Sequence, residues 1–429
     1  MRVQLEYGRQ GLTVELPADR VTDVLALNPA TPLPDEPAAI RAALRAPLGG
    51  PPLAELARGR RNAVIVICDI TRPVPNVVIL PEILAELETA GLGVDDITIL
   101  IATGNHRPNL GDELVELVGA DIASRYRILN HHSEVEEEQA FLGNSSTGVE
   151  MWVDKTYVEA DLKIISGLIE PHFMAGYSGG RKIVCPGLIA FRSVNYFHSP
   201  PLMEHPRAAT GVLEGNPLHQ FALEVCAAAG VDFSVNVVID AERRIGGVFA
   251  GELETAHAAG VAFCDQVCRV PFDEPAEVVL TTSAGYPLDA TFYQAVKGMV
   301  GALPALKPGG TIIIAAELSE GIGGPEFTQM LHEATDHESF MAQILAPGAP
   351  FTKDQWEVEK LCHVLQVGQV VVVSDKVPPV ELERCLVRGA TSVEAAVDEA
   401  LAVYGPAARL LVIPSGPYCI PTPRSDAAC

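Results

Sequence analysis

The sequence has few basic residues, no paired cysteine pattern and no long apolar run. It holds 30 Lys and Arg residues against 55 Asp and Glu, a formal net charge of −25. This charge repels polyanions, so we expect no nucleic-acid partner. No stretch approaches the roughly 20 apolar residues that span a bilayer. Residues 1–17 show no apolar core of signal-peptide type. We therefore expect a soluble, cytoplasmic protein with no membrane partner.

The cysteines are scattered and form no CxxC pair. The closest two, Cys264 and Cys268, are four residues apart in an apolar context. An odd number of cysteines without metal-type spacing predicts reduced, mostly buried thiols rather than a disulfide framework. The nine cysteines stand at positions 68, 185, 226, 264, 268, 362, 385, 419 and 429.

Common cofactor and metal motifs are also absent. No GxGxxG follows the first strand-like run, which argues against a dinucleotide site of the NAD type. No GxxxxGK[ST] predicts a Walker A loop, and no HExxH or Cys/His spacing predicts an all-protein zinc site. A metal bound by this chain would therefore take most of its ligands from elsewhere.

The chain does contain enough apolar material for folded cores. Its 429 residues are 48% hydrophobic and 20% charged, and this length favours two domains. Apolar runs alternate with helical patterns, which predicts βαβ units and largely parallel sheets. The predicted fold class is α/β, with α/β domains at 1–270 and 271–429 and an active-site cleft between them. We expect the acidic run 133–139 to be a solvated helix face, and the Pro-rich end after residue 413 to be a surface tail. The expected strands are 61–69, 97–102, 161–167, 235–240, 277–282, 310–315, 369–374 and 409–413, and the expected helices are 80–90, 290–303 and 392–404.

Most of the reactive residues fall in loops that follow predicted strands, where α/β proteins bind ligands. These loops are CDITRPVPN, ATGNHRP, IEPHFMAGYSGGRK and SAGYPLDATFYQAVKG. His106 and His172 each follow a predicted strand. A facing pair of imidazoles can exchange protons with opposite sides of one carbon, as racemisation requires. The sequence leaves open whether the two rings face each other.

The stretch YSGGRK combines two glycines with Arg181 and Lys182. Glycine lets backbone N–H groups approach an anion, although one such turn is a weak phosphate signal. A desolvated lysine is also a competent nucleophile that can anchor a cofactor. His198, sixteen residues beyond Lys182, is a candidate ligand for nickel, zinc, copper or iron.

Other polar residues bring charge and hydrogen bonds to the predicted cleft. Arg72 can clamp a carboxylate through two hydrogen bonds, whereas Lys297 acts more like a point charge. Each residue taken alone is typical of a surface group. These candidates are Asp69, Thr71, Arg72, Tyr293, Gln294 and Lys297.

Together, these segments resemble the nickel-pincer nucleotide-dependent lactate racemase family. Each segment is weak alone, but they occur in the family's order across most of the chain. The resemblance implies an isomerase, a racemase or epimerase that inverts the C2 hydroxyl carbon of a small, lactate-like 2-hydroxy acid. The segments that carry the likeness are CDITRP, TGNHRP, EPHFMAGYSGGRK, NYFHSP, YQAVKG and DQWEVEK.

The family's cofactor is a pyridinium-3-thioamide-5-thiocarboxylic acid mononucleotide that binds nickel through a ring carbon and two sulfurs. The resemblance implies that Lys182 tethers this nickel-pincer nucleotide and that His198 is the protein ligand to nickel. It implies His106 and His172 as the acid/base pair, with hydride passing to the cofactor and back. Cofactor-maturation enzymes are implied as partners. The implied cofactor-binding residues are Lys182, Ser178, Gly179, Gly180, Asp69 and Thr71, and the implied substrate-binding residues are Arg72, Tyr293, Gln294, Lys297 and Trp356.

Two other interpretations stay open at this point. A non-catalytic carrier of the nucleotide needs only Lys182 and His198, so the presence of both His106 and His172 argues against it. A two-domain nucleotide-dependent oxidoreductase lacks its dinucleotide fingerprint here. Nothing in these loops selects the substrate side chain or the oligomeric state, and non-covalent contacts could replace the tether to Lys182.

Overall fold

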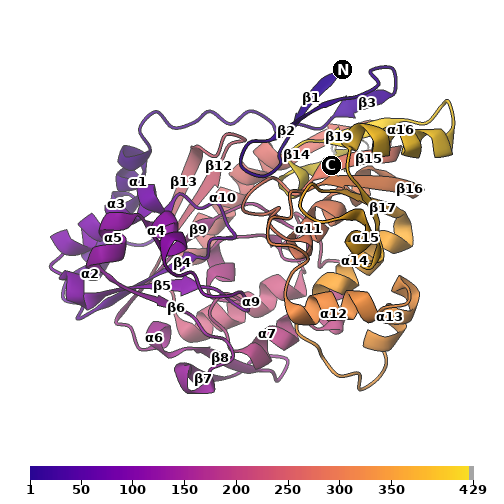
Figure 1. Cartoon of the computed structure of the whole chain (residues 1–429). Helices are drawn as coiled ribbons and strands as arrows, with labels where there is room; N and C mark the ends of the chain where they lie inside the picture. The colour runs from indigo at the N-terminus through magenta and orange to yellow at the C-terminus, as the bar shows by residue number, and fades with distance from the viewer. Residues whose placement is uncertain (425–429) are drawn as a thin grey trace. The chain divides into compact units, whose positions relative to one another are not determined.

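The computed structural model describes residues 1–424, which form two compact units (Figure 1). The first unit contains Met1–Asn28, Ser199–Met203 and the described part of Val267–Cys429. The second contains Pro29–His198 and Glu204–Gln266. Cys429 lies outside the described residues. No helix among the described residues is both long and apolar enough to cross a membrane.

The second unit is built on a six-stranded sheet in the order β13-β12-β9-β4-β5-β6. Its neighbouring strands pair in parallel, except β12 and β13, which are antiparallel. The central strand β4 reads AVIVIC because residues on both of its faces are buried. The six strands are β4 (Ala63–Cys68), β5 (Ile97–Ala102), β6 (Arg127–Asn130), β9 (Leu162–Leu168), β12 (Phe233–Ile239) and β13 (Ile245–Gly251).

Helices α1 to α5 cover one face of this sheet. Leu44 of α1 and Ile83 of α3 share one core with Ile65 and Ile99 of the strands. The helices of this unit are α1 (Glu36–Arg45), α2 (Leu53–Ala57), α3 (Asn76–Thr89), α4 (Asp112–Val118), α5 (Ala120–Arg125), α6 (Lys155–Val158), α7 (Phe191–Phe197), α9 (Pro217–Ala229) and most of α10 (Leu253–Cys268). Its shorter elements are η1 (Val94–Asp96), η2 (Glu136–Glu138), β7 (Gln139–Asn144), β8 (Glu150–Asp154), β10 (Pro171–His172), β11 (Gly176–Tyr177) and η3 (Gly180–Ile183).

The first unit contains an all-parallel sheet in the order β18-β17-β16-β15-β19-β3. Ile312 and Ile314 of β16 pack into a core with α11 to α15, while Ile313 packs with α16 and the β1–β2 hairpin. The strands are β1 (Arg2–Leu5), β2 (Leu12–Glu15), β3 (Val21–Val24), β14 (Arg269–Phe272), β15 (Ala276–Thr282), β16 (Leu306–Ala315), β17 (Gln369–Val373), β18 (Arg388–Ala390), β19 (Leu410–Ile413) and β20 (Ile420–Pro423). The helices are α8 (Pro200–Met203), α11 (Phe292–Ala302), η4 (Leu303–Ala305), α12 (Pro325–Glu333), α13 (His337–Ile344), α14 (Gln355–Val367), α15 (Pro379–Glu383), α16 (Val393–Tyr404) and η5 (Gly416–Tyr418).

The α/β fold class with largely parallel sheets is confirmed, and three details differ from the sequence-based expectation. Residues 1–28, predicted within the N-terminal domain, belong to the first unit, where β3 pairs in parallel with β19. The acidic run 133–139 contains only the 3-10 turn η2 and the start of β7, because its adjacent carboxylates repel one another and offer no apolar helix face. The end after residue 413 forms η5 and β20, and β20 pairs with β14.

The prediction of reduced, mostly buried thiols is also confirmed for the described cysteines. None of these eight cysteines forms a disulfide, and every one except the half-buried Cys68 is buried.

The stability of the first unit is expected to depend on Glu277 in acid. This carboxylate on β15 accepts hydrogen bonds from Lys307 Nζ and, at 2.9 Å, from the backbone N–H of Arg409. Burial alone would raise the pKa of Glu277, but the two bonds lower it from 4.5 to about 2. A carboxyl with a depressed folded pKa stabilises the fold above its unfolded pKa, and that contribution is lost as the pH falls through the folded value.

Between about pH 5 and about pH 2, the wild type should therefore lose about 1 kcal/mol more unfolding free energy than Glu277→Gln, after allowance for the solvent around this pair. Urea unfolding at both pH values measures the difference. Equal losses in the two proteins would show that the Lys307 and Arg409 bonds contribute nothing.

Candidate functional site

The loops after β4, β5 and β9 of the second unit carry most of the predicted site residues. These strands are adjacent and parallel, so their carboxyl ends meet at one edge of the sheet. Asp69 follows β4, His106 follows β5 and His172 follows β9. The topology alone therefore brings these side chains to a common edge.

Asp69 and His106 form a hydrogen-bonded pair across two of these loops. The Oδ2 atom of the buried Asp69 lies 2.6 Å from His106 Nδ1, and Thr71 Oγ1 donates to Asp69 Oδ1 at 2.7 Å. Burial would raise the pKa of Asp69, but His106, Thr71 and Arg72 hold it below its usual value. An ionised Asp69 accepts the Nδ1–H, so a neutral His106 presents an unprotonated Nε2. That is the form a general base needs.

His172 has the opposite arrangement. It is buried on β10, and its Nδ1 accepts the backbone N–H groups of Met174 at 3.4 Å and Ala175 at 3.3 Å. A ring nitrogen that accepts a hydrogen bond carries no proton, so neutral His172 holds its proton on Nε2. In their neutral forms the two histidines would therefore differ at Nε2: that of His106 would be an acceptor and that of His172 would be a hydrogen-bond donor.

Arg72 is paired with a residue that the sequence analysis did not single out. Its Nη1 lies 2.6 Å from Oε1 of Glu170, which is buried just after β9. Ser178 Oγ donates to the same oxygen at 3.3 Å. The ion pair ties the loop after β4 to the loop after β9. Glu170 could have been found from its position in the sequence, because it stands two residues before His172 in the same loop.

Lys182 and His198 both contact the ring of Phe197. Lys182 is half-buried on η3, and its Nζ lies 5.4 Å from the Phe197 ring centroid. His198 is buried at the end of α7, with its ring 4.9 Å from the same centroid. Its Nδ1 lies 3.0 Å from the carbonyl oxygen of Val194. Histidines that bind a metal through Nε2 commonly donate Nδ1–H in this way.

The glycines before Lys182 have a packing role. Gly179 and Gly180 follow Ser178 with φ of +73° and +51°. A Cβ on Gly180 would lie 2.6 Å from the His257 ring, and one on Gly179 would lie 2.8 Å from Asn236 Oδ1. Close contact with the core therefore requires glycine at both positions. The phosphate contact expected of this turn stays a prediction.

The remaining predicted residues, Tyr293, Gln294, Lys297 and Trp356, belong to the first unit. Trp356 Nε1 on α14 donates to the hydroxyl of Tyr293 on α11 at 3.0 Å. Lys297 Nζ donates to Gln294 Oε1 on the same helix, and both of these side chains are buried. The four residues thus form two polar pairs, one between α11 and α14 and one within α11. Their substrate contacts stay predictions.

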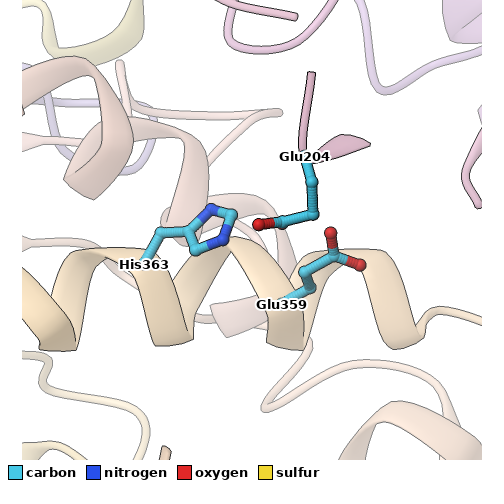
Figure 2. Close-up of side chains that lie close together, drawn as sticks. All are labelled: Glu204, Glu359 and His363. Atoms are coloured by element: carbon cyan, nitrogen blue, oxygen red, sulfur yellow. The ribbon is translucent and has the colours of Figure 1, made fainter. Parts of the chain in front are cut away.

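Glu359 and His363 are a second group of ligand-type side chains in the first unit. They lie four residues apart on α14 and project from the same side of the helix, as Figure 2 shows together with Glu204. Glu204 belongs to the second unit. The pair on α14 alone supplies two ligand atoms, whereas a structural metal site takes four or more from its surroundings. We therefore assign no metal to it.

Comparison with known proteins places the whole chain in one family. Residues 7–211 match the lactate racemase N-terminal domain, and residues 272–420 match the lactate racemase C-terminal domain. A lactate racemase of Thermoanaerobacterium thermosaccharolyticum is 37% identical over 376 residues, covering 87% of this chain and 88% of that protein. A lactate racemase of Lactiplantibacillus plantarum is 36% identical over 417 residues, covering 96% and 98%.

Solved structures agree with these matches. The structure of the lactate racemase apoprotein from T. thermosaccharolyticum has a TM-score of 0.91 and 34% identity, covering 98% of this chain and 100% of that chain. A Thermotoga maritima protein shares the fold at a TM-score of 0.71 and 17% identity, covering 92% and 100%. The chain therefore belongs to the lactate racemase family.

Proposed function

We propose that this chain is an isomerase that racemises a small, lactate-like 2-hydroxy acid with a nickel-pincer nucleotide. Two relatives that match over most of the chain are named lactate racemase. The observation that carries the proposal is the opposite hydrogen bonding at Nδ1 of two histidines: His106 Nδ1 faces the carboxylate of Asp69, whereas His172 Nδ1 faces two backbone N–H groups. Inversion through a planar 2-oxo acid requires one group that takes the hydroxyl proton and another that returns a proton to the carbonyl oxygen.

The second unit also offers residues that fit the cofactor. His198 has the Nδ1 hydrogen bond typical of a metal ligand, and Lys182 supplies a half-buried primary amine beside the same aromatic ring. Among residues 1–424, Glu170 Oε2 and Asn236 Nδ2 are buried polar atoms without a hydrogen-bond partner. Such atoms are costly unless they are satisfied, so a polar ligand near this loop would stabilise them. When bound, the nucleotide would supply a hydride acceptor and donor.

Each protein residue then has a role that its contacts support. Lys182 would hold the nucleotide through its amine, and His198 would offer Nε2 to nickel. His106 takes the substrate hydroxyl proton at Nε2, and the ionised Asp69 stabilises the resulting imidazolium. His172 is the second acid/base group: as the imidazolium it would return a proton from Nε2 to the carbonyl oxygen and become neutral, and the reverse reaction exchanges the two roles.

The remaining proposed contacts involve substrate and nucleotide. Arg72, oriented by Glu170, binds the substrate carboxylate. The polar pairs of the first unit are the proposed substrate contacts of that unit, and the turn at Ser178–Gly180 together with Asp69 and Thr71 contacts the nucleotide. Cofactor-maturation enzymes are the proposed protein partners.

The test is an inversion assay on protein produced together with the cofactor-maturation enzymes of a known lactate racemase. We expect nickel in the purified protein and, from either pure enantiomer of lactate or a related short 2-hydroxy acid, approach to a 1:1 mixture followed by chiral chromatography. Net consumption of the hydroxy acid with accumulation of the 2-oxo acid would instead identify an oxidoreductase.

A nickel-loaded protein that inverts none of a panel of short, aromatic and sugar-derived 2-hydroxy acids would support the carrier alternative. The absence of nickel and of any adduct, from a host that matures the known enzyme in parallel, would overturn the cofactor assignment as well.

A further inference from the structure

Arg181 is a buried cation beside the proposed tether, Lys182. Its side chain is 1% exposed, and within residues 1–424 its hydrogen-bond partners are all neutral. Burial lowers the pKa of Arg181 to about 9, so the guanidinium is still charged at neutral pH. Burying a charge without a carboxylate partner is expensive. Such a residue therefore calls for a role that an apolar side chain would not fill.

The guanidinium binds the loop that contains the proposed site residues. Its Nη2 donates to the carbonyl oxygen of Ala175 at 2.7 Å, and its Nη1 lies 3.4 Å from that of Gly179. One planar guanidinium thus contacts two backbone carbonyls, one just before β11 in the sequence and one just after it. A lysine ammonium could not reach both with the same geometry, because its three donors radiate from a single atom.

His257 of α10 contacts both the guanidinium and the loop. Its Nε2 lies 2.9 Å from Arg181 Nη1. Guanidinium groups only donate hydrogen bonds, so Arg181 Nη1 points a donor at this nitrogen, and the same Nε2 lies 3.0 Å from the carbonyl oxygen of Ser178 in the loop. Burial and the charge of Arg181 both lower the pKa of His257, which keeps the ring neutral. The same ring packs against Gly180, as described above.

We propose that Arg181 and His257 are positioning residues that hold segment 175–182, and thereby the side chain of Lys182, in the orientation needed for the cofactor. The functional part of this inference rests on the proposed function, because it assigns Lys182 a role. The structural part does not depend on it. The contacts run from α10 through the guanidinium to carbonyls within the loop, so their loss should loosen the loop before it weakens the sheet beneath.

Hydrogen exchange on the apoprotein tests the structural part. In Arg181→Lys and in His257→Leu, we expect amides of the peptide that spans 175–182 to exchange about tenfold faster than in the wild type. In His257→Gln, an amide oxygen can again accept from the guanidinium, so exchange should return toward the wild-type rate. Arg181→Lys retains the positive charge but lacks the planar set of N–H donors. A change in this variant is therefore due to the arrangement of the donors and not to the charge.

Tyr157→Phe is the matched control. Tyr157 is fully buried in the same unit, and its hydroxyl donates to Gly230 O at 2.6 Å near the amino ends of β9 and β12. Its loss removes a buried side-chain-to-carbonyl hydrogen bond comparable to that between Arg181 and Ala175, but away from the loop. Exchange in 175–182 should stay unchanged in this variant. Unchanged exchange in folded Arg181→Lys and His257→Leu would overturn the proposal, as would equal acceleration in all peptides of the second unit.

The matured enzyme gives an independent readout. We expect kcat for inversion to fall about 10-fold to 100-fold in Arg181→Lys, with the substrate KM within about twofold of the wild type and partial recovery in His257→Gln relative to His257→Leu. If the wild type carries no adduct and shows no inversion, the proposed function is wrong. The hydrogen-exchange test of the structural part would still be valid. Faster exchange without any change in kcat would overturn the link to Lys182.

Discussion

Asparagine in place of His106 or of His172 is expected to lower kcat for inversion by about 10²-fold to 10⁴-fold, the usual contribution of a positioned acid or base. Asparagine suits both positions because it reproduces the Nδ1 side of each ring. At position 106 its amide N–H can donate to Asp69, and at position 172 its oxygen can accept from Ala175. Both variants thus keep the local hydrogen bond and lack only Nε2. Initial rates from each lactate enantiomer measure the effect.

Both directions of the reaction should slow together in each variant, because the base of one direction is the acid of the other. The control is His132→Asn, whose side chain is 46% exposed and pairs with Glu138. It should retain the wild-type rate. Asp69→Asn keeps a hydrogen-bond partner for His106 but removes the charge that would stabilise its imidazolium. Its inversion rate should therefore lie between those of the wild type and His106→Asn. Near-normal inversion by either His106→Asn or His172→Asn would eliminate the two-base scheme.

The sequence predicted correctly those strands that can be recognised from their own residues, without knowledge of a distant partner. The buried strands β4, β5, β9 and β15 are short and mainly apolar, and each was placed within about two residues of its observed ends. Their loops were therefore also identifiable, because a parallel sheet gathers the carboxyl ends of its strands at one edge. That rule led to His106 and His172 before any contact was known.

The features that the sequence could not reveal depend on partners distant in the chain. β3 joins the sheet of the first unit by pairing with β19, nearly 390 residues later in the chain. Nothing within Val21–Val24 indicates that partner. β20 likewise depends on β14. An isolated proline-rich segment resembles a surface tail until its pairing strand is known. Local pattern therefore predicted the sheets' centres better than their edges.

The same limit applies to the site. The cofactor contact predicted for Asp69 stays a prediction, and the structure adds a hydrogen bond with His106, 37 residues away, that the sequence did not indicate. Arg181 was noted only as positive charge, and its partner His257 lies 76 residues further on. Tautomers follow from such partners, since a histidine's proton goes where its neighbours accept it. His106 and His172 could thus be chosen from the sequence by residue type, but their different hydrogen bonds at Nδ1 could be seen only in the structure.

If the proposed function holds, Lys182→Met is expected to abolish the covalent adduct and to lower inversion by at least about 10³-fold, because the proposed cofactor would carry the hydride chemistry. Methionine retains the apolar stem beside Phe197 but lacks the amine, so the loop should keep its packing. Intact mass under denaturing conditions, with nickel content measured in parallel, reports the result. The wild type should show an added mass that persists on denaturation, and Lys182→Met should show the mass of the bare chain.

Lys163→Met is the matched control for this experiment. Lys163 also lies over an aromatic ring, with Nζ 5.8 Å from the centroid of Tyr157, but it is on the amino-terminal part of β9. Its replacement should leave both adduct and nickel in place. His198→Ala should retain the organic adduct and lose nickel, which separates the tether from the metal ligand. An adduct that survives denaturation in Lys182→Met would move the tether to another residue, and a wild-type adduct seen only under native conditions would make the attachment non-covalent.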